Sequence, residues 1–230
     1  MNEPIEWLPV AGPPEQLLLL LHGVGADGRS MAPLAQALRA EFPQAAIVAP
    51  DAPHPFEAGG AGRQWFSVRG IDEANRVPRA ATALVPLATW VRATQQRLGV
   101  GPAATALVGF SQGAILALDL AAAEDGLAGR VLAFAGRYAQ LPAVAPQHTT
   151  LHLFHGGADA VIPVAHARAA LEHLAALHGD ATIDIAEGVG HELHPVLLRC
   201  ALQRLRTHIP LRTWQAALGA VPGRPGAEDD

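Results

Sequence analysis

A Gly-x-Ser-x-Gly pentapeptide stands at residues 109–113, directly after the apolar run 105–108 and before an alanine-rich stretch with helical character. A strand, a tight turn and a helix in this order hold a serine hydroxyl at the top of the turn, where it can attack a carbonyl carbon. Gly109 and Gly113 leave room where the strand and the helix approach each other. The pattern predicts that Ser111 is a nucleophile.

A serine nucleophile needs a base that takes its proton and an acid that orients the base. Asp159 follows the apolar run 150–154, and His191 follows the alternating run 182–186 in a segment that carries two glycines. Taken alone, an aspartate in a loop more often closes a turn or caps a helix, and one histidine among 11 is unremarkable. The order Ser, Asp, His, with each group at the end of an apolar run, predicts a catalytic triad.

The oxyanion that forms during acyl transfer needs two backbone N–H donors. The first is predicted to come from Gln112, the residue after the nucleophile. The second is predicted to come from segment 22–28, because its glycines let the backbone approach a substrate closely. Val24, which directly follows His22 and Gly23, is the predicted second donor.

Residues 23–28 also read Gly-x-Gly-x-x-Gly after a predicted strand, and Asp51 stands about twenty residues further on, as a dinucleotide-binding fingerprint requires. His22 at the end of the strand and Pro33 inside the following helical pattern weaken this interpretation, which also leaves Ser111 unexplained. A dinucleotide-binding protein remains a remote alternative. A non-catalytic protein on a hydrolase scaffold is a second one, although it would be expected to carry a degraded triad.

Several other residues have a chemical and a structural interpretation. Segment 191–194, His-Glu-Leu-His, lacks the spacing of a zinc-protease helix, so no metal site is predicted. His22 and His155 each precede a glycine at the end of a predicted strand and are expected to make structuring hydrogen bonds. Trp65 and Phe66 either line an acyl pocket or fix their loop to the core.

Short apolar runs alternate with longer helical patterns, which predicts an α/β fold with a mainly parallel central sheet and helices on both faces. The predicted strands are residues 16–21, 45–49, 105–109, 130–135, 150–154 and 182–186, with a weak N-terminal strand near 5–10. The predicted helices are residues 31–41, 79–98, 112–123, 163–177 and 195–207. The predicted site residues follow the ends of these strands.

The length of 230 residues fits one domain, predicted to cover residues 1–218. Residues 219–230 consist largely of glycine, proline and acids, and are predicted to form a disordered tail. Segment 52–77 holds prolines, glycines and charges and is too long for an ordinary connection. We therefore predict that it forms a lid or a pocket wall.

The net charge of −5 and the absence of a basic cluster argue against nucleic-acid binding. The N-terminus lacks a basic stretch followed by an apolar one, and the leucine run 17–21 is too short to span a bilayer, so neither a signal peptide nor membrane insertion is expected. Cys200 is the one cysteine and is predicted to be a buried thiol. A cytoplasmic location is expected on these grounds.

Four motifs together resemble the acyl-protein thioesterase/carboxylesterase branch of the α/β-hydrolases. They are Leu-His-Gly-Val-Gly at residues 21–25, Gly-Phe-Ser-Gln-Gly at 109–113, His-Gly-Gly-Ala-Asp at 155–159 and Gly-His at 190–191. Residues 63–68, 113–115 and 136–138 are similar to small bacterial serine esterases within that branch. The resemblance spans roughly residues 15–210.

This resemblance implies a central parallel sheet, hydrolysis of short- to medium-chain acyl esters or thioesters, and no cofactor. It places nucleophile, acid and base on Ser111, Asp159 and His191, and the oxyanion donors on Val24 and Gln112.

One departure from the branch bears on the substrate. Many of its thioesterases have a glycine where Ala114 stands, so an added methyl group lies near the turn. We therefore predict a serine esterase, with an acyl-protein thioesterase or a lysophospholipase as the alternative. The natural substrate, the limit on acyl length and the oligomeric state are left open by the sequence.

Overall fold

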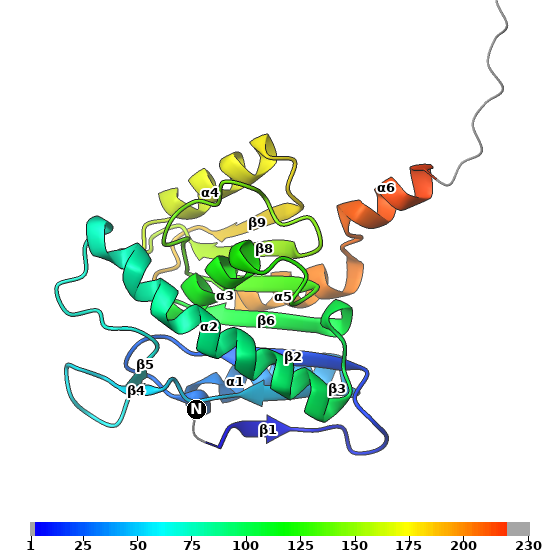
Figure 1. The fold of residues 1–230 in the computed structure, drawn as a ribbon, viewed down its shortest axis with the longest axis horizontal. Coiled ribbons are helices and arrows are strands. Elements are labelled where there is room, and N and C mark those ends of the chain that lie inside the picture. Colours follow the sequence, from blue (N-terminus) through cyan, green and yellow to red (C-terminus); the bar gives the residue numbers. More distant parts are fainter. Residues whose placement is uncertain (1–2, 220–230) are drawn as a thin grey trace, which may run out of the picture.

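A computed structural model describes residues 3–219, and within that range the main sheet has seven strands. Their order is β1-β3-β2-β6-β7-β8-β9 (Figure 1). The strands are β1 (Ile5–Trp7), β2 (Gln16–Leu21), β3 (Ala45–Ala49), β6 (Thr105–Phe110), β7 (Arg130–Phe134), β8 (Thr150–Gly156) and β9 (Ala181–Ala186). Every neighbouring pair is parallel except β1 and β3, which are antiparallel. The predicted mainly parallel sheet is confirmed.

Helices cover both faces of this sheet. Helices α2 (Glu73–Leu98), α3 (Gln112–Ala123) and α4 (Ala165–Ala176) lie on one face, and α1 (Ala32–Glu41) and α5 (Pro195–Thr207) lie on the other (Figure 1). Two 3₁₀ turns, Gly28–Met31 and Pro102–Ala104, precede α1 and β6. The last helix, α6 (Leu211–Gly219), projects from the body of the molecule (Figure 1). No helix among residues 3–219 is both long and apolar enough to cross a membrane.

The continuous apolar runs follow from burial on both faces. In β2, Leu17, Leu19 and Leu21 belong to the hydrophobic cluster under α2, α3 and α4, while Leu18 and Leu20 belong to the cluster under α1 and α5. Successive side chains of a strand point to opposite faces, so a strand covered on both sides needs apolar residues throughout. This burial fixes the register of the central strands and thereby the edge at which they end.

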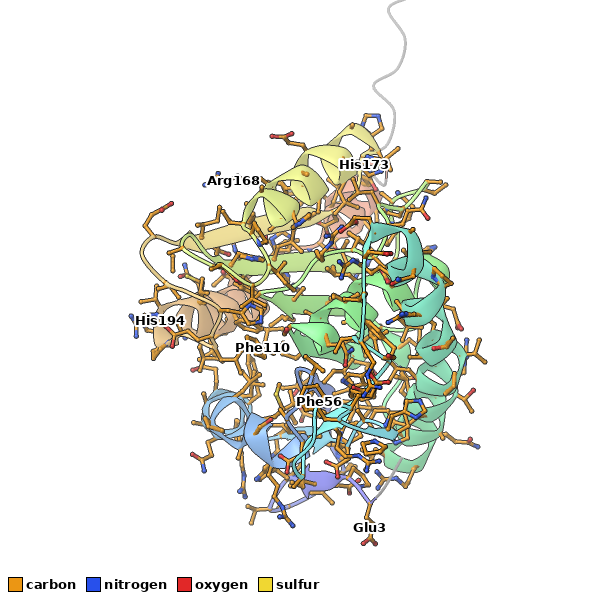
Figure 2. The ribbon with its side chains drawn as sticks, turned by 90° about the vertical axis from the view of Figure 1, so that its left-hand side faces the viewer. Glu3, Phe56, Phe110, Arg168, His173 and His194 are labelled. Atoms are coloured by element: carbon orange, nitrogen blue, oxygen red, sulfur yellow. The ribbon has the colours of Figure 1, made fainter. Side chains whose placement is uncertain are left out.

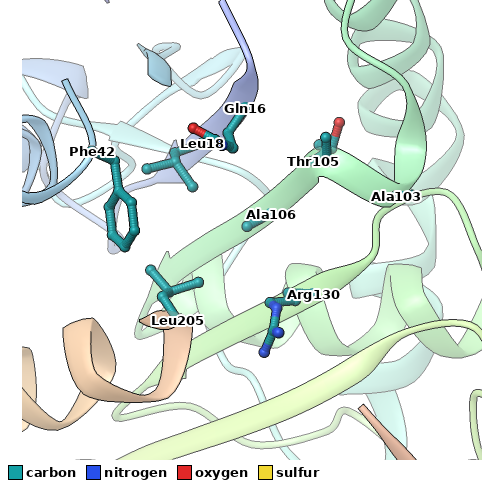
Figure 3. A pocket seen from close by; sticks show the side chains of 9 residues that line it. Gln16, Leu18, Phe42, Ala103, Thr105, Ala106, Arg130 and Leu205 are labelled. Atoms are coloured by element: carbon teal, nitrogen blue, oxygen red, sulfur yellow. The ribbon is translucent and has the colours of Figure 1, made fainter. Parts of the chain in front are cut away.

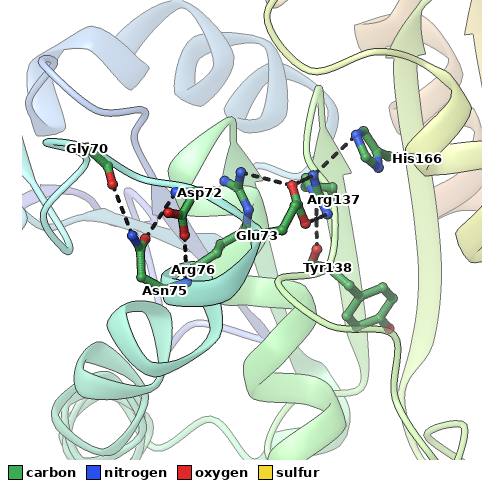
Figure 4. Close-up of polar contacts among 8 residues, drawn as sticks. All are labelled: Gly70, Asp72, Glu73, Asn75, Arg76, Arg137, Tyr138 and His166. Atoms are coloured by element: carbon green, nitrogen blue, oxygen red, sulfur yellow. Dashed lines mark hydrogen bonds and ion pairs between the residues drawn. The ribbon is translucent and has the colours of Figure 1, made fainter.

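The helix α2 begins at Glu73, earlier than the predicted residue 79. Asp72 caps it, because its side chain accepts from the backbone N–H of Asn75 while the Asn75 side chain accepts from the backbone N–H of Asp72 (Figure 4). Pro78 lies inside the helix, near its start. The capping box sets the start of the helix, although a proline disfavours a helix interior.

The predicted long loop, residues 52–77, therefore ends at residue 72, and it contains a small hairpin. The hairpin strands are β4 (His54–Pro55) and β5 (Arg63–Gln64). Where β5 meets the loop after β2, a Cβ added to Gly62 would lie 2.0 Å from the carbonyl oxygen of Gly25. Only a glycine permits this contact, which ties the long segment to the loop after β2.

Other boundaries differ by a few residues. The N-terminal strand covers Ile5–Trp7 rather than residues 5–10, and β7 stops at Phe134 because Ala135 has a φ of 48°. Cys200 is only partly buried on α5, and burial raises the pKa of its thiol. The predicted tail, residues 219–230, lies outside the described residues apart from Gly219, the last residue of α6.

Candidate active site

Ser111 occupies a sharp turn between β6, which ends at Phe110, and α3, which begins at Gln112. Its backbone has a φ of 53° and a ψ of −116°, a conformation that residues other than glycine rarely adopt. The Ser111 N–H donates to the Phe134 carbonyl at 2.9 Å, which fixes the turn against β7.

The two glycines of the pentapeptide are sterically required. A Cβ at Gly109 would lie 2.4 Å from the Gly113 carbonyl oxygen, and one at Gly113 would lie 2.1 Å from the Leu21 carbonyl oxygen. The backbones of β6, α3 and β2 therefore meet without side chains between them. This close approach is the one expected from the pattern of residues 109–113.

The methyl group of Ala114, which stands where the resemblance implied a glycine, is accommodated by Gly136, which follows the end of β7. A Cβ at Gly136 would lie 2.4 Å from the Cβ of Ala114. Ala114 is fully buried, so its methyl group occupies the space that a side chain at residue 136 would need. The departure is thus compensated within the fold.

The structure brings the three predicted triad residues together. His191 Nε2 lies 2.9 Å from Ser111 Oγ, and His191 Nδ1 lies 2.7 Å from Asp159 Oδ2. A carboxylate can only accept hydrogen bonds, so Nδ1 carries the proton and Nε2 is free to accept from the serine hydroxyl. This is the hydrogen-bond arrangement in which the imidazole can take the serine proton.

The carboxylate of Asp159 is held in place by its surroundings. Its Oδ1 accepts from the backbone N–H groups of Val161 and Ile162 at 2.8 and 2.9 Å. Burial acts to raise the pKa of Asp159, but the hydrogen bonds from His191 and from these two N–H groups outweigh it, so the pKa lies below its usual range. The group is therefore ionised at neutral pH.

His155 lies behind this carboxylate and is fully buried. Its Nε2 donates to the Ile162 carbonyl at 2.7 Å and lies 3.3 Å from Asp159 Oδ2. Burial lowers the pKa of His155, which favours the neutral ring. The predicted structuring hydrogen bond is confirmed. The contact with Asp159 was not predicted, although the four-residue spacing between the end of β8 and the loop that follows it could have suggested it.

The imidazole of His191 packs against an aromatic ring in addition to its hydrogen bonds. The rings of Phe110 and His191 have centroids 5.1 Å apart and are tilted by 43°. Phe110 and His194 both lie on the side of the molecule where the parallel strands end (Figure 2). Sequence reasoning missed Phe110, although it belongs to the pentapeptide. Its aromatic character was the available signal.

The two predicted oxyanion donors have free N–H groups. Within residues 3–219, the backbone N–H groups of Val24 and Gln112 donate to no protein acceptor. Gln112 is the first residue of α3, so its N–H has no partner inside the helix. A Cβ at Gly23 would lie 3.3 Å from the Cβ of Ser111, which shows that the loop after β2 reaches the serine.

Asp51 of the alternative dinucleotide fingerprint and His22, which precedes that fingerprint, both bind backbone groups around the loop after β2. Asp51 Oδ1 accepts from the Gly28 N–H at 2.9 Å. His22 Nδ1 donates to the Gly23 carbonyl at 2.7 Å, and its Nε2 accepts from the Ala52 N–H at 3.0 Å. The structuring role predicted for His22 is confirmed. These contacts give both residues a role in shaping the loop.

Trp65 and Phe66 are both buried in the cluster between the sheet and α2 and α3. Trp65 Nε1 donates to the His22 carbonyl at 2.9 Å. The two aromatic residues therefore fix their loop to the core, one of the two roles considered above. A role in an acyl pocket stays a prediction.

The start of α2 is attached to the end of β7 near the site. The Arg137 guanidinium donates to both carboxylate oxygens of Glu73 at 2.9 Å (Figure 4). Arg137 Nη1 also lies 3.2 Å from Nε2 of His166, at the start of α4. These contacts connect the end of the long segment to the strand edge that carries Ser111.

A cavity of about 160 Å³ lies at the opposite edge of the sheet (Figure 3). It is lined by the first residues of three strands, Gln16 of β2, Thr105 of β6 and Arg130 of β7, and by none of the predicted site residues.

Among residues 3–219, no group of three His, Cys, Asp or Glu residues could hold a metal ion. His194 instead caps α5 by accepting from the Val196 N–H.

Three comparisons agree on the relatives of this chain. It is 46% identical to the esterase YpfH of Escherichia coli over 217 residues, 94% of this chain and 92% of that protein. It is 29% identical to acyl-protein thioesterase 1 of Saccharomyces cerevisiae over 168 residues, 66% of this chain and 74% of that protein. The crystal structure of esterase PE8 superposes with a TM-score of 0.79 at 33% identity, covering 88% of this chain and 97% of that one.

The family described as phospholipase/carboxylesterase matches residues 8–209. This range includes the whole sheet from β2 to β9 and the residues after its strands. The chain therefore belongs to the phospholipase/carboxylesterase family.

Proposed function

We propose that the chain is a serine esterase that hydrolyses short- to medium-chain carboxylic esters through an acyl-enzyme. One observation carries the proposal: Ser111, His191 and Asp159 form a continuous chain of hydrogen bonds at 2.9 and 2.7 Å. Membership of the family and the likeness to the E. coli esterase support the same reaction class. We expect the protein to act on a small-molecule ester in the cytoplasm, because a chain with a single cysteine forms no intramolecular disulfide and is compatible with a reducing compartment.

In the first half-reaction, Ser111 Oγ attacks the carbonyl carbon of the ester while His191 Nε2 takes the hydroxyl proton. Asp159 keeps the other ring nitrogen protonated and stabilises the imidazolium that forms. The backbone N–H groups of Val24 and Gln112 donate to the tetrahedral oxyanion. The intermediate collapses when His191 returns the proton to the leaving alcohol, which leaves an ester on Ser111.

In the second half-reaction, water replaces the alcohol. His191 takes a proton from the water, whose oxygen attacks the acyl carbon, and the same two N–H groups stabilise the second oxyanion. His191 then protonates Ser111 Oγ, and the carboxylic acid leaves. The consumption of one ester and one water balances the release of one alcohol and one acid.

Thioesters are the second candidate substrate class. The relative from S. cerevisiae carries the name acyl-protein thioesterase 1, which supports a thioester alternative for this chain. Both substrates pass through the same acyl-enzyme, so the leaving group alone distinguishes them. Parallel series of acyl esters and acyl thioesters of increasing chain length would show which class gives the higher kcat/KM.

Replacement of the nucleophile tests the proposal directly. Ser111→Ala should lose about a millionfold in turnover of p-nitrophenyl acetate and butyrate, as happens when a triad loses its serine. Ser67→Ala is the matched control, because the Ser67 hydroxyl binds only Glu57 on the surface. A fluorophosphonate probe should label wild type and the control, and leave Ser111→Ala unlabelled. Full turnover by folded Ser111→Ala would overturn the assignment.

A further inference from the structure

Both proposed oxyanion donors are carried by segments that contact the same third segment, residues 63–66. Val24 lies in the loop after β2, and Gln112 begins α3. Residues 63–66 lie at the end of the hairpin and far from both in the sequence. The contacts between them involve backbone groups and three buried side chains.

The side chain of Gln112 binds this segment at two points. Its Oε1 accepts from the Trp65 backbone N–H at 2.8 Å, and its Nε2 donates to the Phe66 carbonyl at 2.8 Å. Gln112 is only 3% exposed, so these bonds are shielded from water. The residue whose backbone N–H is a proposed donor is therefore held by its own side chain.

The indole of Trp65 holds the other side. Its Nε1 donates to the His22 carbonyl, two residues before Val24, and its ring lies 5.4 Å from the ring of His22. His22 in turn bonds to the Gly23 carbonyl and to the Ala52 N–H. Burial lowers the pKa of His22, so the neutral ring can donate and accept at once.

Backbone pairing completes the attachment. The Gly25 N–H donates to the Arg63 carbonyl at 2.8 Å, and the Arg63 N–H donates to the Ala26 carbonyl at 2.7 Å. The Arg63 guanidinium donates to the carbonyls of Ala52 and Pro53. The loop that carries Val24 is thus paired to residues 63–66 along its backbone.

We infer that residues 63–66 fix the spacing of the two oxyanion donors, and that the side chains of Gln112 and Trp65 are positioning residues for esterase turnover. The inference rests on the proposed function, because it presumes that Val24 and Gln112 stabilise the oxyanion. Donors of this kind act only when they are held in place before the reaction. A displacement of about 1 Å can cost a hundredfold in rate.

The decisive variant is Gln112→Met, which keeps the length of the side chain and removes both hydrogen bonds. Gln95→Met is its matched control. Gln95 is also buried, and its Nε2 donates to Thr105 Oγ1 and to the Leu127 carbonyl. Gln95 lies on α2 and contacts Thr105, the first residue of β6, whereas Ser111 follows the last, so the control removes buried hydrogen bonds at the end of β6 remote from the site.

A positioning role has a kinetic signature that lost stability does not produce. Gln112→Met should lower kcat by about tenfold to a hundredfold with little change in KM. It should weaken inhibition by a trifluoromethyl ketone, which forms an oxyanion on Ser111, by the same factor as kcat/KM. The pH profile of kcat/KM should keep its shape, because His191 and Asp159 are untouched. Gln95→Met should lose a similar amount in Tm and keep its kcat.

Trp65→Phe provides a second measurement if Gln112→Met does not fold. It removes the indole bond to His22 together with part of the buried ring. Trp90→Phe, at a partly buried position of α2, removes the same part of a ring and serves as its control. A kcat within twofold of wild type in folded Gln112→Met, or an equal loss of kcat in both members of a pair, would overturn this inference alone. Full turnover by Ser111→Ala would overturn the proposed function with it.

Discussion

At the scale of single residues, the site depends on the state of one imidazole. Asp159 faces His191 Nδ1 and is itself fixed by two backbone N–H groups and by His155. Each of these contacts stabilises the ionised carboxylate or its orientation. The base is therefore oriented by a carboxylate that cannot rotate freely.

Asp159→Asn should test this orientation. The amide can donate to Nδ1, which would favour the ring tautomer with its proton on Nε2, where it cannot accept from Ser111. We expect kcat to fall by about ten-thousandfold with a modest change in KM. Steady-state kinetics on p-nitrophenyl butyrate would measure this. An activity within tenfold of wild type would show that Asp159 does not orient the base.

The pair of Ala114 and Gly136 makes a second prediction. Gly136→Ala should place two methyl groups 2.4 Å apart behind the nucleophile, so both Tm and kcat should fall. Ala114→Gly should restore much of the loss when combined with Gly136→Ala, because it removes the opposing methyl group. A double-mutant cycle with thermal unfolding measures the coupling, and additive effects would contradict the proposed contact.

The sequence predicted the members of the triad and not the contacts that hold them. Ser111, Asp159 and His191 could be found because each follows a strand, and parallel strands bring such residues to one edge. The hydrogen bond between Gln112 and Trp65 joins residues that are 47 positions apart. No spacing rule applies to such a pair, because its distance depends on how the hairpin folds back.

At the scale of elements, the main difference concerns residues 52–77. Their prolines and glycines predicted a loop, and the structure has a hairpin and the first turn of α2 there. The β4 and β5 strands have two residues each, too few for an alternating pattern. The start of α2 at Glu73 is hard to predict from the sequence, because Pro78 follows it and a proline disfavours a helix interior.

Helix α3 carries a partly buried carboxylate whose effect on stability can be measured. Asp119 accepts from the Ala139 N–H at 3.0 Å, and burial raises its pKa from 3.8 to about 7. The folded state therefore holds this proton more tightly than the unfolded state, and the associated stability is lost as the pH rises from about 4 through 7.

Asp119→Asn should remove this dependence. The amide oxygen can still accept from Ala139, and the variant has no carboxyl to ionise. Its free energy of unfolding should increase relative to wild type as the pH rises from 4.5 to 8, in urea titrations at both values. A constant difference between the two proteins over this range would exclude Asp119 as a source of pH dependence.

At the scale of the whole molecule, the sheet determines where the chemistry lies. Apolar residues on both faces predicted its strands, and alternation with helices predicted that most of them are parallel. The short antiparallel strand β1 was a weak prediction because three residues leave little pattern. We propose that the described strands and helices form a single domain, supported by the two hydrophobic clusters that share this sheet.

A buried histidine in the sheet, His152, makes the free energy of unfolding depend on pH in the acid range. Burial, together with the nearby Arg130, lowers the pKa of His152 on β8 from 6.5 to about 3. Its ring lies 3.0 Å from Arg130 Nη1 on β7 and 2.8 Å from Thr182 Oγ1 on β9. The folded state excludes the proton that the unfolded state binds, so this stability is present above pH 6.5 and is lost toward pH 3.

His152→Gln should be less stable than wild type at pH 7.5, and the difference should shrink on acidification. Gln can reach some of the same partners and does not titrate, so only wild type loses this contribution between pH 6.5 and 4. Chemical unfolding at several pH values would measure the difference. A gap that widens with acid would contradict the assignment.

Ser111 lies at the end of the sheet opposite to the starts of the parallel strands, and this position has a practical consequence. Ala103, just before β6, and His178, just before β9, are both exposed and lie at the end of the sheet remote from the nucleophile. In a chain whose partly buried Cys200 has been replaced by alanine, a cysteine introduced at either position could carry a fluorescent dye or a tether to a solid support. Enzyme immobilised through that end would present its reactive groups to the surrounding solution and should keep the turnover of the untethered protein.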